Sequence, residues 1–272
     1  MVCARYGACF MIEMKNISKH YTRGFFRKQK TQAVDDVSLT IRTGETLGLV
    51  GESGSGKTTL GRIALRLIEP SSGTVHFDGV DITALSRSAL RKFRRRMQII
   101  FQDPDTSLDP RMTVHDCISE PFTVWNLAGP REIEDRIPEL LEQVGLQPDL
   151  ASRYPFEISG GQKQRVALAR VLALDPTFIV ADEPTAALDI SVQAQVLTLL
   201  KEIQKKRNLT FLFISHDLQV IEKMSDTIAV LHNGKIVEHG ASQDVLKRPR
   251  DSYSRKMIAA ARESEAWFGK SP

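Results

Sequence analysis

Residues 46–58, TLGLVGESGSGKT, join a short apolar run to a glycine-rich loop that ends in lysine and threonine. The apolar part, Thr46–Val50, predicts a buried strand, and the spacing of apolar residues over Leu60–Leu67 predicts a helix after the loop. The loop itself, Gly51–Thr58, matches the pattern G-x-x-x-x-G-K-[ST] in full and lies between a strand and a helix, as that motif requires. The sequence therefore predicts a phosphate-binding loop, called the P-loop below.

Each residue type of the P-loop has a chemical reason. Glycines let the backbone wrap closely around phosphates, and successive N–H groups at the positive end of a helix attract the anion. We expect Lys57 to reach the β- and γ-phosphates of a nucleotide and the Thr58 hydroxyl to bind Mg²⁺. The P-loop alone leaves the chemistry open, because kinases, GTPases, helicases and transporter motors all use it. The predicted nucleotide-binding positions of this stretch are Gly51, Glu52, Ser53, Gly54, Ser55, Gly56, Lys57, Thr58 and Thr59.

The composition is that of an ordinary globular protein. Hydrophobic residues make up 42% and charged residues 26% of the 272 positions, which excludes wholesale disorder and allows a sizeable core. The excess of 37 Lys and Arg over 33 Asp and Glu gives a net charge of +4, which is too small to favour nucleic acid binding. The longest apolar candidate, residues 166–181, is interrupted by Arg170 and Asp175, so we expect no membrane-spanning helix.

The N-terminus and the cysteines favour a reduced, cytosolic protein. Residues 1–12 carry a short apolar run without the cleavage site of a secretory signal, and Met11 and Met14 are alternative starts to Met1. An odd number of cysteines without metal-ligand spacing is typical of a reducing compartment. The cysteines are Cys3, Cys9 and Cys117.

Strand and helix signals alternate along the chain, which predicts an α/β fold with a largely parallel sheet. The segment 103–157 departs from this alternation, since it is punctuated by proline and helical in pattern. We therefore expect an α/β core with the P-loop over 12–102 and 158–240, a helical subdomain over 103–157 and a helical C-terminal tail over 241–272. Strands are expected at 12–18, 33–41, 46–50, 73–77, 97–101, 178–181, 209–214, 227–231 and 235–238, and helices at 114–124, 132–144, 161–173 and 191–205. The basic stretch Thr22–Thr31 is predicted to be an exposed loop, and the basic run Arg91–Arg96 a solvated helix face.

Two carboxylates follow the apolar strand Phe178–Ala181. In an open α/β sheet this position lies at the carboxyl edge, where ligands bind. Asp182 is placed to hold Mg²⁺ directly or through water, and Glu183 to position and polarise an attacking water as general base. A carboxylate pair after a strand is often only a turn, but its register with an upstream P-loop favours hydrolysis of a nucleotide.

Residues 158–165, ISGGQKQR, resemble the signature motif of ATP-binding cassette (ABC) ATPases. Four further features match that family in the expected order. These are Tyr21 for the aromatic that stacks on adenine, Gln102 for the Q-loop, Ala187-Leu188-Asp189 for the D-loop and His216 for the switch histidine. The resemblance covers residues 12–245 and implies a P-loop NTPase fold of the ABC cassette type, with a RecA-like core, an antiparallel β subdomain and an inserted helical subdomain.

The resemblance also implies residue roles and cofactors. In the family, two nucleotide domains close head-to-tail over two ATP molecules, each pairing one P-loop with the signature of its partner. By position, Glu183, His216 and Gln102 would be catalytic, and Thr58, Gln102 and Asp182 would hold Mg²⁺. The residues that would contact the nucleotide of the partner are Ser159, Gly160, Gly161, Gln162 and Asp189. The implied cofactors are ATP and Mg²⁺.

Three segments are similar to the oligopeptide, dipeptide and nickel importer branch of the family. They are residues 50–54 (VGESG), 101–111 (FQDPDTSLDPR) and 182–189 (DEPTAALD). The sequence departs from the branch at 249–254, PRDSYS, where His-Pro-Tyr-Thr is common, and at Ile158, where leucine is usual. No cysteine follows Cys117, which excludes the cysteine-bearing tail of many members.

The branch implies the ATP-hydrolysing subunit of a bacterial or archaeal importer for oligopeptides or dipeptides, peripheral on the cytoplasmic face of the cell inner membrane. The implied partners are two transmembrane permease subunits, a second and unlike ABC ATPase subunit (a homodimer is the alternative) and, indirectly, an extracytoplasmic solute-binding protein, with no nucleic acid. Nickel, antimicrobial peptides and glutathione remain alternative cargoes. A soluble ABC ATPase outside transport is a further alternative, disfavoured because the chain has neither a long coiled-coil insertion nor a second cassette.

Overall fold

The computed structural model describes residues 10–23 and 29–268, and the chain divides into two compact units. Unit 1 comprises Met1–Leu90 and Thr210–Pro272, and unit 2 comprises Arg91–Leu209. The first residue Met1, the cysteines Cys3 and Cys9 and the centre of the expected loop Thr22–Thr31 lie outside the described residues.

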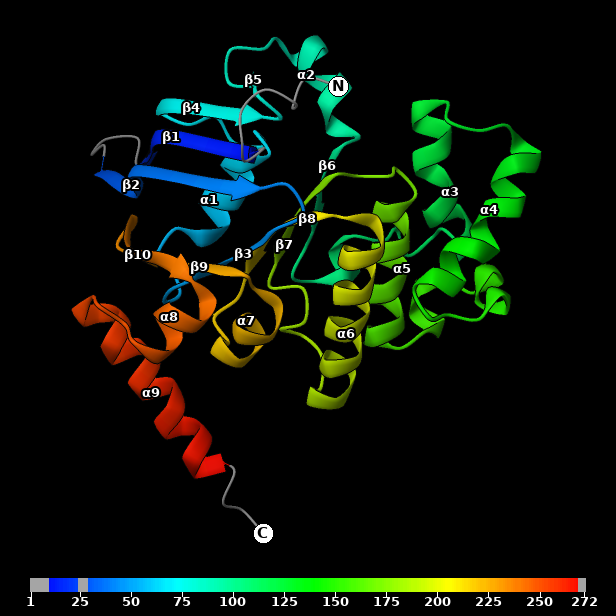
Figure 1. Ribbon diagram of the computed structural model, residues 1–272. Coiled ribbons are helices and arrows are strands. Elements are labelled where there is room, and N and C mark those ends of the chain that lie inside the picture. Colours follow the sequence, from blue (N-terminus) through cyan, green and yellow to red (C-terminus); the bar gives the residue numbers. More distant parts are fainter. Residues whose placement is uncertain (1–9, 24–28, 269–272) are drawn as a thin grey trace. The chain divides into compact units, whose positions relative to one another are not determined.

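Unit 1 contains an antiparallel sheet of four strands in the order β2-β1-β4-β5 (Figure 1). The strands are β1 (Phe10–Arg23), β2 (Gln29–Arg42), β4 (Ser72–Phe77) and β5 (Val80–Asp81). The expected loop over Thr22–Thr31 is too long, because β1 and β2 stay paired as far as Arg23 and Gln29. Strand-forming residues such as Tyr21 and Thr22 extend the hairpin at the cost of the loop.

A second group of strands in unit 1 carries the P-loop. Its members are β3 (Thr46–Val50), β8 (Thr210–Ile214), β9 (Thr227–His232) and β10 (Lys235–Ala241). β3 pairs in parallel with β8 and with β9, and β10 pairs antiparallel with β9. Every residue of β3 and β8 is buried, as their unbroken apolar runs predict for parallel strands covered on both faces.

Four helices accompany these strands in unit 1. They are α1 (Lys57–Ala64), α7 (Leu218–Met224), α8 (Ser242–Lys247) and α9 (Ser252–Phe268). Helix α1 contacts β2 and β8, and α7 contacts β3. Helix α8 contacts β9 and β10, so the tail expected over 241–272 begins packed on unit 1, and α8 and α9 are its helical parts as far as Phe268.

Unit 2 combines a parallel strand pair with helices. Its strands are β6 (Met97–Ile100) and β7 (Phe178–Asp182), paired from Met97–Phe178 to Ile100–Ala181. Its long helices are α3 (Val114–Trp125), α4 (Pro130–Gln143), α5 (Gly160–Leu172) and α6 (Ile190–Arg207). Helix α5 contacts α3, α4 and α6 (Figure 1), and the boundary between the units falls within α2 (Arg87–Arg94).

Within residues 10–23 and 29–268, no helix is both long and apolar enough to cross a bilayer.

Candidate nucleotide site

The P-loop leaves the buried strand β3 and ends in the first turn of α1. Two of its glycines are required by close backbone approach: a Cβ on Gly51 would lie 2.1 Å from the Leu231 carbonyl oxygen, and a Cβ on Gly56 would lie 2.2 Å from that of Ala33. Gly56 also has a φ of 109°, which favours glycine. The loop therefore owes its shape to contacts with β2 and β9 as well as to its own sequence.

Lys57 is buried in the P-loop, with 6% of its surface exposed. Its ammonium donates hydrogen bonds to the carbonyl oxygens of Gly51 (2.7 Å) and Glu52 (2.9 Å). The Ser55 hydroxyl is also buried and has no hydrogen-bond partner among the described residues. A phosphate would accept a hydrogen bond from the Ser55 hydroxyl and would be attracted by the Lys57 ammonium, so both groups suit a phosphate ligand.

The expected switch residue His216 lies at the same edge of unit 1 as the P-loop. β3 and β8 are parallel, and Leu49 of β3 pairs with Ile214 of β8. The segments that follow these two strands therefore begin at neighbouring carboxyl ends. His216 is exposed, and the next residue, Asp217, caps α7 by accepting hydrogen bonds from the N–H groups of Gln219 and Val220. Unit 1 thus brings together the P-loop and His216.

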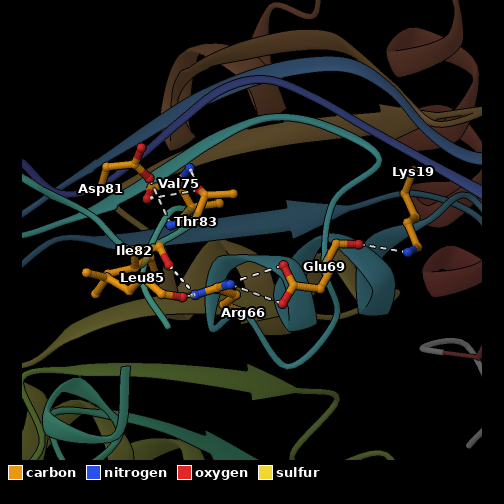
Figure 2. A network of polar contacts seen from close by, with 8 residues as sticks. All are labelled: Lys19, Arg66, Glu69, Val75, Asp81, Ile82, Thr83 and Leu85. Atoms are coloured by element: carbon orange, nitrogen blue, oxygen red, sulfur yellow. Dashed lines mark hydrogen bonds and ion pairs between the residues drawn. The ribbon is translucent and has the colours of Figure 1, made fainter. Parts of the chain in front are cut away.

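Tyr21 is on β1, with 40% of its surface exposed. The ammonium of Lys19 lies 5.3 Å from the centre of its ring and donates a hydrogen bond to the carbonyl oxygen of Glu69 at 2.7 Å. Figure 2 shows that Glu69 in turn pairs with Arg66, whose guanidinium also donates to the carbonyl oxygen of Ile82. This network connects the strand of Tyr21 to the segment that follows α1.

Unit 2 brings together Gln102, Asp182 and Glu183. The parallel pair β6 and β7 ends at Ile100 and Asp182, so Gln102 and Glu183 both follow the carboxyl ends of neighbouring strands. Asp182 is 6% exposed, whereas Gln102 is exposed. Glu183 has a φ of 50°, a left-handed conformation that a non-glycine residue rarely adopts and that is enriched at functional sites.

The signature segment begins helix α5 with a capping box. The Ser159 hydroxyl accepts a hydrogen bond from the Gln162 N–H, and the Gln162 side-chain oxygen accepts one from the Ser159 N–H. Both Ser159 and Gly160 are exposed. This arrangement presents the positive end of a helix to the surface of unit 2, and so suits an anion brought by another molecule.

Asp189 caps helix α6 at an exposed position. Its carboxylate accepts hydrogen bonds from the N–H groups of Val192 (3.0 Å) and Ser191 (3.1 Å). These bonds, that of Val192 foremost, hold the pKa of Asp189 below its usual value. The carboxylate is therefore ionised at neutral pH and fixed in direction.

One contact in unit 2 was not predicted from the sequence. The ammonium of Lys163, in α5, lies 2.6 Å from the Asp105 carboxylate in the segment that follows Gln102. Opposite charges 58 positions apart carry no local signal, so the pair becomes visible only in the fold. It connects the expected Q-loop segment to the signature helix.

A cavity of about 260 Å³ in unit 2 lies between β6, α3 and α5. Arg170 crosses it, donating to the Ser107 carbonyl oxygen (3.1 Å) and pairing with the Glu120 carboxylate (2.6 Å). Val124 lines the same cavity and is 54% exposed. Arg170 could be recognised in the sequence as the charge that interrupts the apolar run 166–181. The cavity around it could not be recognised there.

The expected magnesium ligands fit that ion by their chemistry. Thr58, Gln102 and Asp182 offer a hydroxyl, an amide oxygen and a carboxylate, which are the hard oxygen donors that Mg²⁺ prefers. Within 10–23 and 29–268 no three His, Cys, Asp or Glu side chains gather into a metal cluster. Mg²⁺ needs no such cage, because it is usually bound by one or two side chains together with water and substrate phosphates.

Several known proteins are similar to this chain. The family model described as ABC transporter matches residues 34–186, which include the P-loop, Asp182 and Glu183. The oligopeptide transport ATP-binding protein OppF of Bacillus subtilis is 48% identical over 252 residues, covering 92% of this chain and 82% of that protein. The glutathione import ATP-binding protein GsiA of Pectobacterium atrosepticum is 50% identical over 232 residues, 85% of this chain and 37% of that protein. A solved dimeric ATP-binding cassette, in a post-hydrolysis state with ADP and Pi, matches with a TM-score of 0.77 and 31% identity over 85% of this chain and 99% of that chain.

Proposed function

Because this chain belongs to the ABC transporter family and is an ATP-hydrolysing cassette, we propose that it powers the import of oligopeptides or dipeptides through a membrane permease. The observation that carries the proposal is the 48% identity to an oligopeptide transport ATP-binding protein over 92% of the chain. Deletion of the gene should abolish uptake of labelled di- and oligopeptides in the host, and the intact gene should restore it. Normal uptake in the deletion strain would contradict the peptide cargo.

A second cargo, glutathione, is favoured by one observation: GsiA is named a glutathione import protein and is 50% identical over 85% of this chain. The two cargoes are separated by the same strain. Loss of labelled glutathione uptake with intact dipeptide uptake would assign glutathione, and the reverse result would assign peptides.

We assign the following roles in ATP binding and hydrolysis to the residues that match the motifs of the family. Lys57 and the P-loop N–H groups bind the phosphates, and Tyr21 stacks on adenine. Glu183 polarises the attacking water, and His216 and Gln102 contact the γ-phosphate and the metal. Thr58, Gln102 and Asp182 hold Mg²⁺. The supporting fact is that, apart from Tyr21 on β1, these residues lie at or after the carboxyl ends of parallel strands within their own unit.

The proposed active form is a head-to-tail dimer of cassettes in which the signature of one chain completes the ATP site of another. Ser159, Gly160, Gly161, Gln162 and Asp189 would face the partner's nucleotide. Two large apolar side chains flank these segments, Ile190 with 86% and Phe156 with 72% of their surfaces exposed. A partner chain would cover such residues. We propose an unlike second cassette as the partner, with a homodimer as the alternative.

A substitution at the capping serine tests whether the signature of a partner chain completes the ATP site. Ser159→Arg should abolish hydrolysis in the assembled complex, because it removes the cap of α5 and places a bulky cation where the partner's nucleotide binds. ATP binding to the isolated chain should change less than about twofold, since the P-loop lies in the other unit. Hydrolysis and ATP titration check the two expectations, and loss of ATP binding by the isolated chain would contradict a site completed by a partner.

The cavity beside Arg170 is the proposed docking site for the permease. It is lined by apolar side chains of α3 and α5 around a fixed ion pair, which is the usual character of a helix-binding groove. We propose that the chain is a peripheral subunit on the cytoplasmic face of the membrane. The helical segment 103–157, which supplies α3 and α4, would be the subdomain that moves with the permease.

A charge introduced into this cavity by substitution tests whether the permease docks there. Val124→Glu should reduce co-purification with the permease by about tenfold or more, because an unpaired charge would be buried in the contact. The matched control is Val80→Glu, at a valine of similar exposure (40%) in unit 1. Equal permease recovery with both variants would exclude the groove as the docking site. ATP binding by the isolated chain should be unchanged in each.

A further inference from the structure

The first turn of the C-terminal helix α9 reaches the P-loop. The Tyr253 hydroxyl accepts a hydrogen bond from the backbone N–H of Glu52 at 3.3 Å, across 201 positions of sequence. Both residues belong to unit 1. A segment that follows every motif of the ATP site in sequence therefore contacts that site directly.

The start of α9 is fastened to β10, so this contact is not a chance approach of a loose tail. The Glu238 carboxylate accepts hydrogen bonds from the N–H groups of Arg250 (2.8 Å) and Asp251 (3.2 Å). The Asp251 carboxylate then accepts from the N–H groups of Tyr253 (2.8 Å) and Ser254 (3.3 Å). Ser254 is fully buried. The backbone N–H groups of Tyr253 and of Ser254 are thus both held by the Asp251 carboxylate.

The ring of Tyr253 is held as well. It stacks on His232, with ring centres 3.8 Å apart and an angle of 27° between the planes. His232 ends β9, and two residues later the Gly234 N–H donates to the Ser55 carbonyl oxygen of the P-loop at 3.0 Å. The turn after β9 and Tyr253 therefore bind the P-loop at two points, Ser55 and Glu52.

The geometry at Glu52 explains what the hydroxyl does. The Glu52 N–H and the Gly51 carbonyl belong to one planar peptide group. The carbonyl end accepts a hydrogen bond from the Lys57 ammonium at 2.7 Å, and the N–H end donates to Tyr253. Rotation of this peptide group would break both bonds together. The hydroxyl of Tyr253 therefore limits the rotation of the group that holds the P-loop lysine.

The tyrosine is suited to this task at neutral pH. Burial, together with the neighbouring Glu52 carboxylate, raises the pKa of Tyr253, although the backbone N–H of Glu52 acts in the opposite direction. The hydroxyl therefore keeps its proton, and it retains a lone pair for the N–H.

We propose that Tyr253 is a positioning residue of the ATP site: through the Gly51–Glu52 peptide it sets the position from which Lys57 binds phosphate. This role deepens the proposed function and rests on it. The C-terminal tail then also has a role, because α8 and the start of α9 support Tyr253 where it reaches the P-loop.

The variant Tyr253→Phe tests the role, because it deletes one oxygen and keeps the ring that stacks on His232. In the full-length chain we expect ATP binding to weaken by roughly three- to tenfold, as for one lost hydrogen bond. The melting temperature should stay within about 2 °C of wild type, because the ring and the anchors of α9 remain. Hydrogen exchange resolved to single residues should show faster exchange at the Glu52 amide and unchanged exchange in β10. The control Tyr154→Phe, at an exposed tyrosine of unit 2, should alter none of these quantities.

Each other outcome has a definite meaning. Unchanged ATP affinity in Tyr253→Phe overturns the proposal, and so does weaker affinity accompanied by faster exchange throughout β10 and α9, which would show that the helix had merely come loose. If the wild-type chain itself bound no ATP, the proposed function would fail. The Glu52 amide exchange would still show separately whether the hydroxyl holds the peptide.

Discussion

Replacing Lys57 with alanine should abolish ATP hydrolysis in the assembled complex. The ammonium is buried and held by the carbonyl oxygens of Gly51 and Glu52, so its loss removes the one fixed positive charge within the P-loop. A charge-assisted hydrogen bond to phosphate is worth about 1.5–3 kcal/mol, which predicts ATP binding weaker by roughly 10- to 150-fold. Loss of a preorganised charge at the transferred phosphate should lower turnover by a further factor of about 100 or more.

The matched control for this variant is Lys206→Ala, which removes an exposed lysine from α6. It should bind and hydrolyse ATP like the wild type. ATP titration and phosphate release measure the two effects. Turnover at the wild-type rate in Lys57→Ala would show that the P-loop is not the phosphate site.

Replacing Glu183 with glutamine should produce the opposite combination, with ATP bound but turned over slowly. The amide keeps the size of the side chain but cannot take a proton from water, so hydrolysis should fall by about 100- to 10,000-fold. Because ATP would favour the closed pair of cassettes and would no longer be consumed, the dimer should accumulate. Gel filtration with light scattering, with and without ATP and Mg²⁺, would detect it.

Two comparisons make the Glu183→Gln result interpretable. Glu202→Gln, at an exposed glutamate of α6, should turn over normally and should form no lasting dimer. If Glu183→Gln alone stays monomeric with ATP, co-expression with the second cassette ATPase recovered from the native host distinguishes an obligate unlike partner from a wrong assignment. Rapid hydrolysis by Glu183→Gln would contradict the role of general base.

The parts of the site that follow one another closely in sequence could be predicted from the sequence. The P-loop, the carboxylates after β7 and the signature segment at the start of α5 each depend on a few neighbouring residues whose local geometry is fixed by strand ends, glycines and caps. Their elements lie where the patterns predict them. The expected helix 191–205, for example, is Ile190–Arg207, and the expected strand 178–181 is Phe178–Asp182.

Contacts between distant segments could not be predicted in the same way. The pairing of β1 with β2 beyond Tyr21 is set by cross-strand partners, so the expected loop over 22–31 is too long. The ion pair of Lys163 with Asp105 and the bond from Glu52 to Tyr253 join residues 58 and 201 positions apart. Neither has a periodic or spacing signal, because only the fold brings the partners together.

The most direct test of the account is to identify the proteins that this chain binds in its native host. A tagged full-length chain should be purified from membranes in mild detergent, with the tagged Val124→Glu variant in parallel, and its partners identified by mass spectrometry. We predict two multi-spanning permease subunits and a second cassette ATPase with the wild-type chain, and loss of the permeases with the variant. Recovery of the wild-type chain only from the soluble fraction, with no membrane partner, would contradict the account of this protein as an importer subunit.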